Sequence, residues 1–182
     1  MTKSTSRVAA CAVVCAVAAL LALPASAQQP AAPNSVSAAL ARDVGTLSDK
    51  FTGLAKAMTG KYEWKPGDGV RSVGEVFNLI VNENKMLTGV LTGAGAPSGP
   101  RPAPITDPAQ LQEALKSSYA TLQQAVSGLS ESDLAAPVKM FGRDTTKQGA
   151  ALMLLFDQHE HLGQSIAYAR SNGVVPPWSQ GR

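Results

Sequence analysis

Apolar residues recur every three or four positions along much of this chain, and that spacing restricts the folds it can form. The clearest run is one stripe of seven residues, Val36, Leu40, Val44, Leu47, Phe51, Leu54 and Met58. Such spacing is the period of the buried face of an α-helix. No stretch alternates apolar and polar residues over a useful strand length, so the sequence predicts an all-α fold without a sheet.

Capping signals place three more helices. Ser72 and Glu75 match a capping box at the start of the second helix. Asp107 followed by a proline starts the third, and Gly128 ends it. Asn172 with the glycine after it ends the fourth. The predicted helices are 36–58, 72–91, 107–128 and about 145–171, with a short helical turn at 130–133.

The connection between the second and third predicted helices is long. Residues 92–106 hold four prolines and three glycines, with Ile105 as the one large apolar side chain. Adjacent antiparallel helices need only a few connecting residues. A connection of this length therefore predicts a crossover along the side of a four-helix bundle, or a mobile lid.

The first 27 residues have the parts of a secretory signal. Lys3 and Arg7 precede an apolar run of about 16 residues, and Ala25-Ser26-Ala27 follows it. A retained membrane anchor is the alternative, but crossing a bilayer takes about 20 residues. A lipoprotein would need a cysteine after the apolar run. We expect a signal peptide at 1–27, a flexible leader at 28–35 and a bundle at 36–179, exported to the periplasm or secreted.

Cleavage changes the chemistry that the chain offers. Both cysteines, Cys11 and Cys15, lie in the signal, so the 155 residues from Gln28 onward have no thiol for a disulfide or a nucleophile. They keep 14 basic and 13 acidic residues, a formal charge of +1. The basic residues are scattered, which argues against a nucleic-acid partner. We expect no membrane contact after cleavage and an unidentified small molecule as ligand.

Three titratable residues are candidate metal ligands. Asp157 and His161 stand four residues apart on one face of the fourth predicted helix, a spacing that lets two side chains bind one ion. Glu83 lies on the apolar side of the second predicted helix, where a carboxylate needs a partner. The alternative is a simple hydrogen bond or ion pair between Asp157 and His161, with His159 on the surface.

Several segments also resemble a known family. They are YEWKP at 62–66 with RSVGEVFN at 71–78, FGRDTT at 141–146, and HEHLGQSIAYAR at 159–170 with GVVPPW at 173–178. In these segments the chain resembles the DinB/YfiT-like group of bacterial four-helix bundles. The resemblance implies a bundle with a long crossover between its second and third helices.

The resemblance also implies a metal site and shows a departure from it. Members commonly bind zinc or nickel with three histidines, and characterised relatives include thiol-dependent S-transferases and a mycothiol-dependent isomerase. In this chain the three positions hold Leu79, Asp157 and His161. Leucine cannot bind a metal, so only one of the three histidines remains. Glu83, one turn beyond Leu79, is the replacement ligand that the second helix offers.

Three hypotheses follow for the function. The favoured one is an exported bundle whose metal site is lost and which serves as a non-catalytic binding or structural module. The alternative is a metal-dependent transferase or hydrolase that uses Glu83, Asp157 and His161. The third is a bundle that binds a partner, such as a second copy of itself in a homodimer, through the apolar tail at 174–178. The alternative for this tail is that Trp178 folds back onto its own bundle.

We predict that the protein is exported and cleaved after Ala27. Mass spectrometry of the protein from the periplasm or the medium should show Gln28 as its first residue, because small residues at 25 and 27 direct signal cleavage. Replacing Ala27 by a bulky residue should leave the precursor uncut. A wild-type protein that keeps Met1 and stays with the membrane would show a retained anchor instead.

Overall fold

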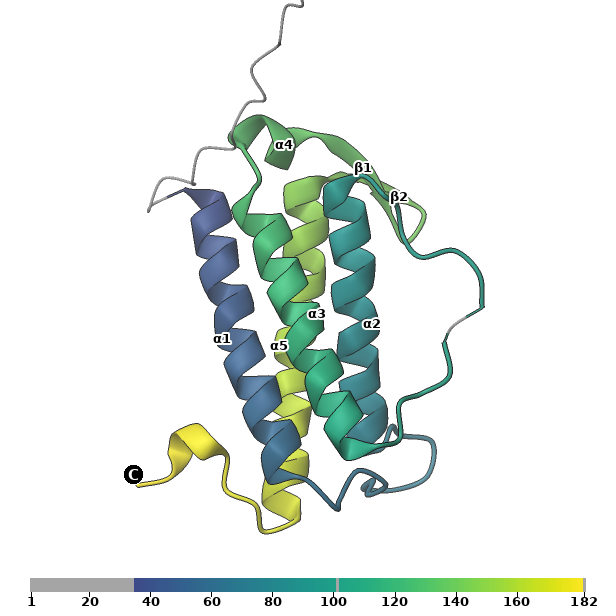
Figure 1. Ribbon diagram of the computed structural model, residues 1–182, viewed down its shortest axis with the longest axis vertical. Coiled ribbons are helices and arrows are strands. Elements are labelled where there is room, and N and C mark those ends of the chain that lie inside the picture. Colours follow the sequence, from purple (N-terminus) through teal and green to yellow (C-terminus); the bar gives the residue numbers. More distant parts are fainter. Residues whose placement is uncertain (1–34, 101, 182) are drawn as a thin grey trace, which may run out of the picture.

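The computed structural model describes residues 35–100 and 102–181. Four long helices, α1 (Val36–Ala57), α2 (Val73–Thr92), α3 (Pro108–Ser127) and α5 (Lys147–Ser171), run along the long axis of the molecule (Figure 1). The four helices predicted from apolar spacing are therefore present. The expected signal peptide and all of the leader except Ser35 lie outside the described residues. Within the described part, no helix is long and apolar enough to cross a membrane.

The predicted capping signals start the helices. Ser72 accepts a hydrogen bond from the Glu75 amide at 3.3 Å, and Glu75 accepts one from the Ser72 amide at 2.7 Å. Asp107 accepts from the Gln110 amide at 2.8 Å at the start of α3. These bonds satisfy amides that have no partner within the first turn of a helix. They fix where α2 and α3 begin, and so which residues of each helix face the core.

Residues 93–100 and 102–106 lie in the predicted crossover, and α2 and α3 run in the same direction on either side of it (Figure 1). Asn78 of α2 binds the end of the crossover that leads into α3. Its Nδ2 atom donates to the Ile105 carbonyl at 3.0 Å, and its Oδ1 atom accepts from the Ile105 amide at 2.8 Å. The Gly95 amide donates to the Gly89 carbonyl at 2.9 Å. The crossover is therefore bound to α2 near both of its ends.

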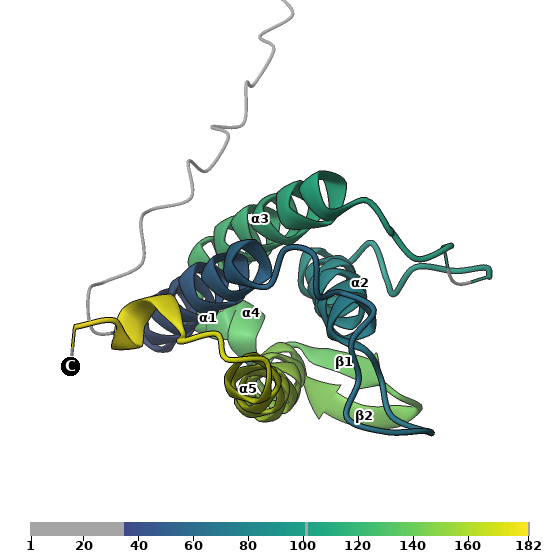
Figure 2. The same ribbon diagram turned by 90° about the horizontal axis from the view of Figure 1, so that it is seen from below.

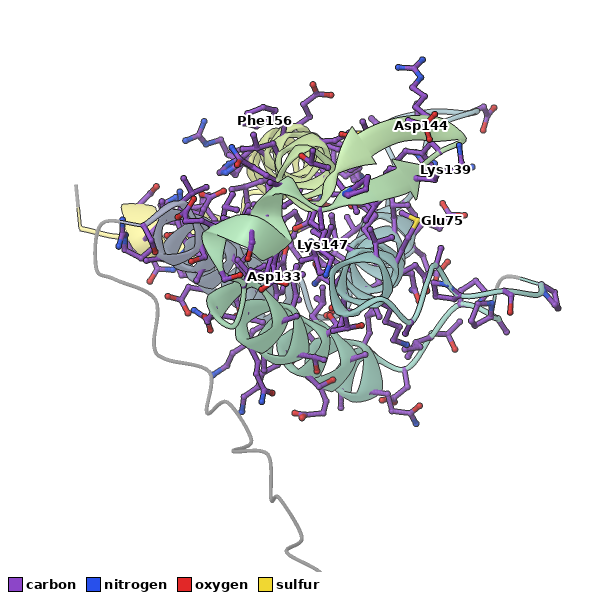
Figure 3. All side chains as sticks on the ribbon, turned by 90° about the horizontal axis from the view of Figure 1, so that it is seen from above. Glu75, Asp133, Lys139, Asp144, Lys147 and Phe156 are labelled. Carbon is purple, nitrogen blue, oxygen red and sulfur yellow. The ribbon has the colours of Figure 1, made fainter. Side chains whose placement is uncertain are left out.

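The prediction that the chain has no sheet is wrong. After the short helix α4 (Glu131–Ala135), strands β1 (Pro137–Met140) and β2 (Arg143–Thr146) form an antiparallel hairpin. Phe141 and Gly142 make the turn with φ of 49° and 75°, as two-residue hairpin turns require. Lys139 and Asp144 face each other across it at 2.6 Å (Figure 3). Strands of four residues are too short for apolar alternation to mark them in a sequence.

One core fills the space between the four helices. Phe51 of α1 stacks on Tyr119 of α3 at 6.2 Å and meets Phe77 of α2 edge-on at 6.4 Å. Phe156 of α5 is the main exception, since it points outward and is 63% exposed (Figure 3). Seen end-on, α5 lies beside both α1 and α2, and the hairpin lies next to α5 on the side of α2 (Figure 2).

The C-terminal tail turns back along α1. It carries the short helix η1 (Pro177–Ser179), and Trp178 packs partly buried against the core with the Lys50 ammonium 5.6 Å from its ring. Trp178 therefore packs on its own bundle, which was the alternative to a contact with a partner through the tail. Trp64, in the connection between α1 and α2, packs edge-on against Tyr168 of α5 at 5.3 Å.

We predict opposite effects from two alanine substitutions at helical glycines. In Gly89→Ala the added methyl would collide with the Gly95 carbonyl, so the free energy of unfolding should fall by about 1 to 3 kcal/mol. The control, Gly163→Ala, meets nothing nearby and should raise it by about 0.5 to 1 kcal/mol. Urea unfolding measures both. Equal effects at the two sites would contradict the close approach of the crossover to α2.

Candidate metal centre

The three candidate ligands come from the middle of two neighbouring helices. Glu83 lies on α2, and Asp157 and His161 lie on successive turns of α5. The two helices lie side by side in both end-on and side views (Figures 1 and 2). Residues 74 positions apart in the sequence are thus brought to one point between two helices.

The side chains converge. One ligand atom from each of Glu83, Asp157 and His161 lies within 4.8 Å of the other two. His161 Nε2 is 3.6 Å from Asp157 Oδ2. Ligands that share one ion at 2.0–2.2 Å lie about 3 to 3.5 Å apart when adjacent, so a shift of about 1 Å or less would bring all three into range. Of all described residues, only these three form such a group.

Burial differs across the site. Glu83 is 6% exposed, and its Oε2 atom is buried without a hydrogen-bond partner. The side chain of His161 is 16% exposed and that of Asp157 is 46% exposed. One wall of the site is therefore closed by the bundle and another is open to solvent. Solvent therefore reaches the site from the side of Asp157.

Burial also controls the charge of Glu83. It raises the pKa of the Glu83 carboxyl to about 8, together with the hydrogen bonding and negative charge of Asp157. The Gln158 amide and the Arg71 charge act in the opposite direction and lower it. Without a cation, Glu83 is consequently protonated and uncharged at neutral pH.

The residues fit a divalent cation. Glu83 Oε2 is an unpartnered acceptor at the point where the other two side chains meet. Two carboxylates and one imidazole are donors that divalent metal ions accept, and together the carboxylates would balance the charge of such an ion. The simple Asp157–His161 ion pair foreseen as an alternative leaves the Glu83 oxygen without a partner. It therefore accounts for less of the site.

A hydrogen-bond chain that sequence reasoning missed lies behind His161. Its Nδ1 atom is 2.9 Å from Gln164 Oε1, and Gln164 Nε2 donates to the Tyr168 hydroxyl at 2.8 Å. The Tyr168 hydroxyl donates to the Arg71 carbonyl at 3.2 Å. The steps of three and four residues from His161 to Gln164 and Tyr168 are a signal that could have found it.

A second network lies beneath the site in the core. Gln158 accepts from the Tyr119 hydroxyl at 3.0 Å and donates to Asn84 Oδ1 at 2.9 Å. Asn84 donates to the Ser118 hydroxyl at 3.1 Å. Gln158 and Asn84 are fully buried and flank Asp157 and Glu83 in the sequence. The layer ties α2, α3 and α5 together directly under the candidate ligands.

The other residues singled out from the sequence lie outside the convergent group. His159 is on the surface, as expected, with its Nε2 atom 3.0 Å from Asp43 of α1. Leu79 is partly buried and lines a hollow of about 150 Å³ with Arg71 and Asn82, against the crossover. Arg71 also lines a hollow of about 470 Å³ together with Gln164. Two concave surfaces thus lie next to the chain of hydrogen bonds that reaches His161.

Comparison with known proteins agrees with this architecture. The model of the DinB superfamily matches residues 46–165, which include all three convergent side chains. The chain belongs to the DinB superfamily. The crystal structure of the DinB-like protein YjoA from Bacillus subtilis has a TM-score of 0.63 to this DinB domain at 18% identity, covering 79% of this chain and 99% of that one. No curated protein matches the chain.

We predict that the metal-free protein loses stability as pH rises, through Glu83. The pKa of Glu83 is about 8 in the folded chain against 4.5 when unfolded, so folding favours the protonated form. This contribution is complete below about pH 4.5 and is lost as pH rises through about 8. Urea midpoints with chelator present should therefore fall between pH 5 and 8.

The Glu83→Gln variant should lose this part of the pH dependence, because an amide does not ionise in this range. The matched control is Glu160→Gln, which removes an exposed carboxyl from α5. It should follow the wild-type profile. Identical profiles for wild type and Glu83→Gln would contradict a protonated Glu83.

Proposed function

We propose that this DinB domain binds one divalent cation through Glu83, Asp157 and His161 and acts as a metal-dependent hydrolase or transferase on a small molecule. The observation that supports this most is the unpartnered, buried Glu83 oxygen facing Asp157 and His161 from the neighbouring helix. It favours the metal-dependent alternative over a lost site, because a buried polar atom without a hydrogen-bond partner costs free energy that a bound cation would remove.

Each ligand would contribute differently. Glu83, closed in by the bundle, would hold the buried side of the ion and give up its proton on binding. Asp157 and His161 would hold the solvent side from one face of α5. A divalent ion with three protein ligands keeps open positions, and when bound it lowers the pKa of a coordinated water or thiol.

The residue types bear on the metal and on the reaction. Carboxylate oxygens suit harder ions such as Mn²⁺ better than the three-histidine set does, although zinc also accepts them. The described residues contain no cysteine, so a thiol in the reaction would have to come from the substrate. Outside the cytoplasm, where we propose that the protein works, low-molecular-weight thiols are scarce. Hydrolysis is therefore the form of the reaction that we favour.

We predict one tightly held divalent ion per chain. Isothermal titration of the chelated protein with Zn²⁺ and Mn²⁺ should give one site in the wild type. Glu83→Gln and His161→Ala should each weaken it at least tenfold, since each removes a ligand. The control His159→Ala removes the other histidine from the same helix and should keep wild-type affinity. The non-catalytic hypothesis requires the reverse, a wild type that binds no metal.

A further inference from the structure

The direction of every hydrogen bond behind His161 can be fixed from its far end. The chain ends at the Arg71 carbonyl, which can only accept. Tyr168 has one hydroxyl hydrogen, and that hydrogen goes to the Arg71 carbonyl at 3.2 Å. The Tyr168 oxygen must therefore accept from Gln164, whose NH₂ group faces it at 2.8 Å.

The orientation of Gln164 in turn determines which nitrogen of the His161 imidazole carries the hydrogen. With its NH₂ group turned to Tyr168, Gln164 presents its carbonyl oxygen to His161 Nδ1 at 2.9 Å. An amide oxygen can only accept, so Nδ1 carries the hydrogen. The orientation of Gln164 thus follows from the network and does not depend on telling its oxygen from its nitrogen.

We propose that Gln164 and Tyr168 are positioning residues that hold His161 in the Nδ1–H tautomer and leave Nε2 as a bare acceptor facing Asp157 and Glu83. Nε2 is the ring atom 3.6 Å from Asp157. Metal-binding histidines are commonly oriented by a hydrogen bond from the other ring nitrogen. Only the metal-binding consequence rests on the proposed function, because the tautomer is a property of the metal-free protein.

The Tyr168 end of this hydrogen-bond chain is held by the loop between α1 and α2. Trp64 contacts the Tyr168 ring edge-on at 5.3 Å, and the Trp64 carbonyl accepts from the Val73 amide at the start of α2 at 3.0 Å. Tyr168 is 8% exposed. The imidazole of an α5 residue is thereby oriented from the loop that leads into α2, the helix that carries Glu83.

His159, the other histidine of α5, is expected to have the opposite tautomer and serves as an internal reference. His159 Nε2 lies 3.0 Å from both carboxylate oxygens of Asp43, which can only accept, so its hydrogen is on Nε2. We therefore expect opposite tautomers for the two histidines when both rings are neutral. Long-range ¹H–¹⁵N correlation spectra of histidine-labelled protein, recorded with chelator at a pH where both rings are neutral, distinguish the two forms.

The variants test the positioning directly. In Tyr168→Phe and Gln164→Ala, His161 should lose its single Nδ1–H form and show a mixture or the Nε2–H form, while His159 is unchanged. Gln164→Glu should retain the wild-type tautomer, because the introduced carboxylate still accepts from Nδ1. Tyr62→Phe and Gln148→Ala remove the same groups elsewhere and serve as controls. Tyr168→Phe keeps the ring that packs on Trp64, so it should remain folded and still test the inference if Gln164→Ala does not fold.

A wild-type His161 in the Nε2–H form, or an unchanged His161 tautomer in both Tyr168→Phe and Gln164→Ala, would overturn the inference. Metal affinity gives a second readout: Gln164→Ala should weaken binding about 10- to 100-fold, whereas Gln148→Ala should not. If the wild type shows the expected tautomer but binds no metal, the proposed function fails and the positioning role stands. If metal binds but Gln164→Ala alters neither tautomer nor affinity, the positioning role fails alone.

Discussion

A carboxylate enclosed between packed helices needs a proton, a donor or a cation, and Glu83 imposes that requirement at the middle of α2. Its Oε2 atom has no partner, and its pKa is raised to about 8. The helix packed alongside supplies Asp157 and His161 at the same level of the bundle. Three properties of the site follow from this one buried group. They are the protonation of Glu83 in the metal-free protein, the proposed position of a cation, and the orientation of His161 toward that position.

The resemblance to DinB-like bundles implies a three-histidine site, and the residues of this chain would give that site different electrostatics. Three neutral imidazoles leave the charge of a divalent ion uncompensated, whereas Glu83 and Asp157 can balance it. Leu79 stands on α2 where the resemblance implies a metal-binding histidine, and Glu83, the proposed ligand, lies one turn further along the same helix. Under the proposed function, the bundle keeps a cation site in the same region with different donors.

Much of this could be predicted from the sequence, because helical spacing and capping are local. Ser72 with Glu75 fixed the start of α2, and its spacing placed Glu83 inward. Other features depend on contacts that no local pattern contains. The hairpin at 137–146 has strands of four residues, and the bond from Tyr168 to the Arg71 carbonyl joins residues 97 positions apart. Helical spacing could have paired Gln164 with His161 and Tyr168, but the direction of their hydrogen bonds could not be assigned before the contact with Arg71 was known.

Crystal diffraction at the absorption edge of a bound metal tests the central claim most directly. Crystals of the chelated protein, soaked in Zn²⁺ or Mn²⁺, should give one anomalous peak about 2.0 to 2.2 Å from Glu83, Asp157 and His161 Nε2. No peak at this point, or a peak that Glu83 does not contact, would contradict the account.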